Sequence, residues 1–155
     1  MKKQLMLIAL GAIVLLYACS SDPERGSTPQ TGIPKLVTHE DSLVHDVLEG
    51  HDAGMARMIK LSKYIKKTKL LLDSVAAVPA AKRNREYEAG LKGLLEDLQY
   101  AEMSMNTWMD EFKLDSLKDK PREREAYLES EKMKVTKMKE AILNSLQKGD
   151  SLLKK

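Results

Sequence analysis

The sequence contains few of the residues and motifs that usually carry catalysis. It has one cysteine among 155 residues, so no disulfide within the chain is possible. Aromatic residues make up 5% of the chain, with a single Trp, which leaves little material for base-stacking or sugar-binding surfaces. We find no Gly-rich phosphate loop, no serine-elbow motif and no isolated carboxylate pair in an apolar setting. We therefore predict that the protein is not an enzyme.

The chain also lacks an excess of charge of one sign. It has 26 Lys and Arg against 23 Asp and Glu, and two of the lysines, Lys2 and Lys3, lie in the first 18 residues. Acidic and basic residues are interspersed along the rest, as on the solvated faces of helices. Nucleic-acid binding needs a concentrated basic face, so we predict no nucleic-acid partner.

The one long apolar run lies at the start of the chain. Residues 1–18 have a basic beginning followed by an apolar stretch over residues 5–16, which is typical of a signal peptide and short for a membrane span. The run ends in Leu16-Tyr17-Ala18-Cys19, which resembles a bacterial lipobox. We therefore predict cleavage before Cys19 and lipid attachment to it, which would anchor the protein to a membrane. Ser20 after the cysteine favours the outer membrane, with the protein facing the periplasm.

Residues 19–36 are predicted to form a flexible tether. Prolines and glycines recur there among Ser, Thr and Gln, at Pro23, Gly26, Pro29, Gly32 and Pro34. Such a segment has too few apolar residues to bury a core of its own.

Residues 37–155 carry three long apolar seams at steps of three and four, which predict helices over about 38–76, 84–114 and 121–154. The first seam is Val44, Val47, His51, Gly54, Met58, Leu61, Ile65, Thr68, Leu72 and Val75. The second is Tyr87, Leu91, Leu94, Leu98, Ala101, Met105, Trp108 and Phe112. The third is Leu128, Glu131, Val135, Met138, Ile142, Ser145, Gly149 and Leu152, widened by Leu146 and Leu153.

The start signals agree with these helices. Thr38 with Asp41 resembles a capping box, Asn84 suits an N-cap, and Pro121 suits a first turn. Short turns make neighbouring helices antiparallel. We therefore predict an all-α fold, an elongated antiparallel three-helix bundle with coiled-coil-like packing. An oligomeric coiled coil is the alternative, because three long helices have a thin core.

A group of His, Met and Trp residues has two interpretations. A turn near residue 80 would place Trp108 beside Gly50 and Gly54, so the glycines would make room for the indole and His51 would be a core histidine. The second interpretation is a soft-metal site, because imidazole and thioether groups suit Cu(I). Its candidate ligands are His51, Met55, Met58, Met105 and Met109. Haem held by His and Met is a weaker variant, and His39, His45 and His51 are spaced wrongly for zinc.

Three segments resemble a known group of proteins. They are His51-Asp52-x-x-Met55-x-x-Met58, Met105-x-x-Trp108-Met109-x-x-Phe112, and Tyr127-Leu128 with Lys134-Val135. With the lipobox, they look like small Bacteroidetes lipoproteins that carry the label "viral A-type inclusion protein". The resemblance covers about residues 43–153 and implies an envelope location and a helical fold. It implies no activity and no catalytic residues.

Together these observations predict a lipid-anchored envelope protein of structural or protein-interaction type. An envelope protein partner would bind an exposed apolar stripe, expected on the third helix. A homo-oligomer is the other expected association. The alternative is a periplasmic protein that binds or handles copper.

Overall fold

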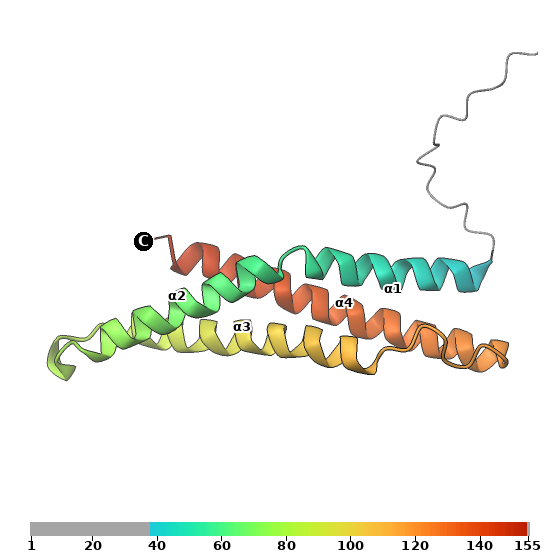
Figure 1. Cartoon of the computed structure of the whole chain (residues 1–155). Helices are drawn as coiled ribbons and strands as arrows, with labels where there is room; N and C mark the ends of the chain where they lie inside the picture. The colour runs from blue at the N-terminus through green and yellow to red at the C-terminus, as the bar shows by residue number, and fades with distance from the viewer. Residues whose placement is uncertain (1–37, 155) are drawn as a thin grey trace, which may run out of the picture. The chain divides into compact units, whose positions relative to one another are not determined.

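The computed structural model describes residues 38–154, and these residues form helices and no strand (Figure 1). The elements are α1 (His39–Met55), α2 (Met58–Ala76), the short 3₁₀ helix η1 (Ala80–Lys82), α3 (Arg85–Glu111) and α4 (Pro121–Leu152). The prediction of an all-α bundle is confirmed. The predictions for residues 1–36, Cys19 included, lie outside the described residues.

The first predicted helix is wrong in one respect, because it is two helices broken at Ala56 and Arg57. The N–H of Arg57 donates to the carbonyl of Gly54 at 2.9 Å, three residues back instead of four. The carbonyl of Ala53, which loses this donor, accepts a hydrogen bond from Nη1 of the Arg57 side chain at 2.5 Å. Two glycines in the preceding turns, Gly50 and Gly54, lower the cost of breaking the helix here.

The break lets the two halves pack on different neighbours. α1 lies mainly against α4, whereas α2 lies mainly against α3 (Figure 1). Ion pairs from Lys132 to Asp46 at 2.6 Å and from Lys60 to Asp150 at 2.9 Å show that α1 and α2 run parallel to α4.

α3 runs antiparallel to α4 along the length of both helices. Trp108 near the end of α3 pairs with Glu131 near the start of α4, and Asp97 farther back on α3 pairs with Lys148 farther along α4. The up-down-up order that short connections impose is therefore confirmed.

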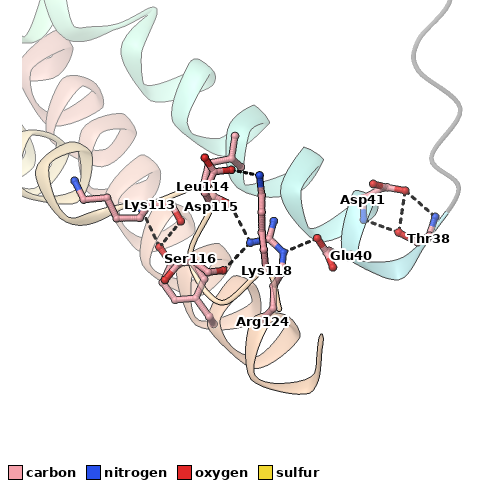
Figure 2. A network of polar contacts seen from close by, with 10 residues as sticks. Thr38, Glu40, Asp41, Lys113, Leu114, Asp115, Ser116, Lys118 and Arg124 are labelled. Carbon is pink, nitrogen blue, oxygen red and sulfur yellow. Dashed lines mark hydrogen bonds and ion pairs between the residues drawn. The ribbon is translucent and has the colours of Figure 1, made fainter. Parts of the chain in front are cut away.

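The helix starts follow the sequence signals. Asp41 N–H donates to Oγ1 of Thr38 at 3.0 Å and Thr38 N–H donates to the Asp41 carboxylate at 3.0 Å, which is the predicted capping box (Figure 2). Asn84 caps α3 by accepting from the N–H of Tyr87 at 3.0 Å. Pro121 is the first residue of α4. Each device satisfies a backbone N–H that a helix start leaves without an intrahelical partner, or replaces it with proline.

The core is built by the predicted seams. Its buried apolar residues are Leu43, Val47, Leu61, Ile65, Leu91, Leu94, Leu98, Ala101, Met105, Trp108, Leu128, Val135, Met138, Ile142, Leu146 and Leu153. All of them except Leu43 belong to a predicted seam. Two polar seam positions, Glu131 and Ser145, are also buried, and each makes a hydrogen bond. Among the described residues, no helix is long and apolar enough to cross a bilayer.

A buried arginine, Arg124, connects α1, α4 and the α3–α4 connection at one end of the bundle, which we call the closed end. The sequence pattern did not predict that this arginine is buried. The guanidinium of Arg124 on α4 donates from Nε to the Glu40 carboxylate at 2.5 Å (Figure 2). Its Nη1 donates to the carbonyls of Leu114 at 2.9 Å and Ser116 at 2.7 Å. Arg124 therefore connects the first turn of α1 to the segment between α3 and α4. One guanidinium can make all three hydrogen bonds because it is planar and carries several N–H donors.

Candidate protein-interaction groove

Four rings form a row across three helices near the closed end of the bundle. His51 on α1 lies 5.3 Å from Trp108 on α3, and Trp108 stacks on Phe112 with ring centroids 4.6 Å apart. Phe112 stacks in turn on Tyr127 of α4 at 6.3 Å. Trp108 and Phe112 are four residues apart and so lie on one face of their helix. The meeting of His51 with Trp108 also confirms the predicted register between the first and second long segments.

The indole of Trp108 is held by a buried carboxylate. Nε1 of Trp108 donates to Oε2 of Glu131 at 2.9 Å, and Nζ of Lys134 donates to Oε1 of the same carboxylate at 2.7 Å. The hydrogen bond to Glu131 raises the pKa of Lys134 above its ordinary value. Both oxygens of Glu131 therefore have a donor, which offsets the cost of burying the charge.

The interpretation of the glycines as a space for Trp108 is wrong. A Cβ on Gly50 would lie 2.9 Å from Cγ1 of Val135, and a Cβ on Gly54 would lie 2.7 Å from Cε of Met105. The glycines thus allow close approach of α4 and of a methionine of α3. The indole lies beside His51 instead, on the same level of the bundle.

The structure distributes the candidate copper ligands between the core and the surface. Met105 is fully buried, whereas the side chains of Met55 and Met109 are 39% and 40% exposed. Met55 ends α1 and Met58 begins α2, so the break separates two residues that were expected on one continuous helical face. His51 pairs through Nδ1 with Asp52 at 2.9 Å.

Within residues 38–154 no group of three or more His, Cys, Asp or Glu side chains is placed to hold a metal ion. Methionine sulfur is a further ligand type for soft metals, so copper binding stays a prediction. Met105 fills the core beside Gly54, as a packing role requires. His51 is only partly buried, with its side chain 22% exposed, so it is not the core histidine that the packing interpretation expected.

A groove runs along the outer side of the α3–α4 pair. Its wider part has a volume of about 320 Å³ and is lined by Tyr100, Met103, Ser104, Thr107, Trp108, Glu111, Lys134, Lys137 and Met138. A second part of about 250 Å³ continues it and is lined by Asp97, Tyr100, Ala141, Asn144, Ser145 and Lys148. Tyr100 belongs to both parts, so they form one surface, which we call the α3–α4 groove.

The α3–α4 groove combines a fixed base with exposed apolar walls. Trp108, held by Glu131, and Met138 are buried at its base. Tyr100 and Met103 on its wall are 59% and 58% exposed. Large apolar side chains that are exposed beside a rigid base are typical of surfaces that bind a helix from a partner.

The prediction of an exposed stripe on the third long helix is thus met only in part. The exposed Met133 and Leu143 of α4 do not line the groove, and its exposed apolar residues, Tyr100 and Met103, belong to α3. From α4 the groove takes the buried Met138 and polar side chains. The candidate surface is formed by two helices together, and neither seam alone could indicate it.

A second polar cluster joins α2 to the far end of α4. Oη of Tyr64 donates to Oδ1 of Asp150 at 2.5 Å, and Nζ of Lys60 donates to Oδ2 at 2.9 Å. These bonds, that of Tyr64 first, lower the pKa of Asp150, and the bond to Asp150 raises the pKa of both Lys60 and Tyr64. The ring of Tyr64 lies over Gly149, where a Cβ would be 2.8 Å from Cε2. The geometry of this cluster fastens α2 to α4.

No family model, curated protein or solved structure matches the chain. The resemblance to small Bacteroidetes lipoproteins therefore stays a prediction.

Proposed function

We propose that the protein is a lipid-anchored, non-catalytic component of the bacterial envelope that acts through protein contacts. In this proposal Cys19 carries the lipid, and the helical bundle faces the periplasm from the outer membrane. The α3–α4 groove is the surface that binds a partner. The lipobox pattern at Leu16–Cys19 supports the location.

One observation carries the interaction part of the proposal. Tyr100 and Met103 are more than half exposed, beside an indole that is fixed by a buried hydrogen bond. A monomer gains nothing from exposing two large apolar side chains at one place. A partner that covers them would gain about 25 cal/mol for each Å² of apolar surface removed from water.

Site-specific photocross-linking in living cells tests this proposal. A photoreactive amino acid at Met103 should give a discrete cross-linked product. The matched control is the same amino acid at Leu70 on α2, which is 67% exposed and lies outside the groove. Equal products at both positions, or none at Met103, would contradict the proposed role of the groove.

A further inference from the structure

The charged residues of the α3–α4 groove are segregated by helix. Those contributed by α3 are the acids Asp97 and Glu111, and those contributed by α4 are the lysines Lys134, Lys137 and Lys148. The groove therefore has one acidic edge and one basic edge. Such a surface is complementary to a copy of itself if the acidic edge of one copy meets the basic edge of the other.

We propose that the partner in this groove is a second copy of the chain, related by a twofold axis parallel to the helices. The inference rests on the proposed function of the groove. In this dimer α3 of one copy packs against α4 of the other, and the four helices form a bundle. The groove is covered in both copies at once, because a twofold interface uses the same surface twice.

The positions of the charged residues along the helices agree with a twofold axis parallel to the helices. We call a position along the helices a height. Asp97 and Lys148 lie at one height, since Nζ of Lys148 donates to Asp97 at 2.6 Å within one chain. Glu111 and Lys134 line the same part of the groove farther along. An axis parallel to the helices preserves height, so each acid of α3 meets the corresponding lysine of the opposite α4.

The other twofold arrangement is disfavoured by the same charges. An axis across the helices would stack α3 on α3 and α4 on α4 in antiparallel pairs. The acidic edges would then face each other, and so would the lysines. Like charges placed opposite each other at an interface are costly.

In the dimer, Lys148 and Asp97 would pair with the other copy instead of with each other. Breaking their ion pair within one chain costs little free energy. The side chains of Lys148 and Asp97 are 47% and 51% exposed, and exposed ion pairs contribute at most about 1 kcal/mol. The gain comes from burying Tyr100 and Met103. Ser104 and Ala141, which also line the groove, are small and let the two helix pairs approach closely.

The groove itself is smaller than a standard interface. On α3 it runs from Asp97 to Glu111, which is about 21 Å of helix at about 1.5 Å per residue. Two adjacent helices are about 20 Å wide, so each copy buries about 400 Å² in the groove, an area typical of weak or transient association. The parallel orientation also puts Thr38, where the helices begin, at the same end of both copies, an arrangement that suits anchoring to one membrane.

Co-purification of two differently tagged full-length copies from detergent-solubilised membranes tests the dimer. Two charge variants are needed: variant A carries Asp97→Lys, and variant B carries Lys148→Glu, the two residues that pair at one level of the bundle. Lys134 stays unchanged because it holds Glu131. Circular dichroism melts verify that both variants are folded.

Wild-type copies should co-purify, whereas A with A and B with B should do so at least about tenfold less, because like charges then face each other. A with B should co-purify as well as wild type, because every edge again meets its opposite. Wild-type copies that do not associate would overturn the dimer, and so would A with A or B with B at the wild-type level. Cross-linking of Met103 to a different protein would then still support the proposed function, so the two failures are distinguishable.

Discussion

Nε1 of Trp108 and the carboxylate of Glu131 form a buried hydrogen bond of 2.9 Å that joins α3 to α4 beneath the groove. Neither group has solvent available to replace its partner, since both side chains are nearly fully buried. The bond therefore fixes the position of the indole at the base of the groove.

Glu131→Ala should destabilise the protein by about 2–4 kcal/mol, because it leaves the indole N–H unpaired and creates a cavity. Urea unfolding followed by fluorescence measures this directly, since Trp108 is the only Trp in the chain. The control is Glu129→Ala, at an exposed position two residues before Glu131, which should change the free energy of unfolding little. Equal stability of the two variants would show that the bond is unimportant.

Gly149→Ala should destabilise the opposite end of the bundle by about 1–3 kcal/mol, because the new methyl group would overlap the ring of Tyr64. Gly93→Ala should instead stabilise by about 0.5–1 kcal/mol, since alanine is the better helix former. Its Cβ meets only the flexible end of Lys148 at 3.5 Å. Thermal melts compare the two, and a loss of similar size at Gly93 would contradict this account.

The stability of the protein should fall in acid partly through Asp150. Its pKa is lowered in the folded state by Tyr64 and then Lys60, so its contribution is present above the ordinary Asp pKa of about 3.9. The contribution is lost as pH falls through the lower folded value. Asp150→Asn should therefore reduce the loss of melting temperature between about pH 5 and pH 3.

Asp119→Asn, at an exposed position of the α3–α4 connection, is the control for this pH experiment and should leave the slope unchanged. Equal acid slopes for Asp150→Asn and wild type would show that the cluster makes no pH-dependent contribution.

Copper titration separates the two interpretations of the His and Met group. We expect no tight one-to-one binding of Cu(I) in a competition assay, because Met105 is enclosed in the core while Met55 and Met109 are at the surface. Replacement of His51, Met55 and Met109 by Leu should leave the titration unchanged. Tight binding that this triple variant loses would support a copper protein instead.

Much of the fold could be predicted because helical periodicity is local. The seams gave nearly the whole core, and the caps at Thr38 and Asn84 marked two of the helix starts. The break after Met55 could not be predicted, because it depends on which helix each half packs against. Gly54 signals only that a close approach is allowed.

The candidate site was less predictable, because it depends on contacts between residues that are far apart in the sequence. Arg124 lies in a run of charged residues and resembles a surface residue, but its partner Glu40 is 84 residues away. Glu131 is a polar residue in an apolar seam, and its bond to Trp108, 23 residues away in the sequence, explains its burial. The groove arises from two helices together, so neither periodic pattern contains it.

Lipid attachment is the most direct test of the central claim, that the protein is anchored in the envelope. Cells that express the wild type, Cys19→Ala or the control Ser21→Ala are labelled with palmitate and fractionated. The wild type and Ser21→Ala should carry label and sediment with the outer membrane, whereas Cys19→Ala should lose the label and leave that fraction. An unlabelled wild type, or equal label on Cys19→Ala, would contradict the account.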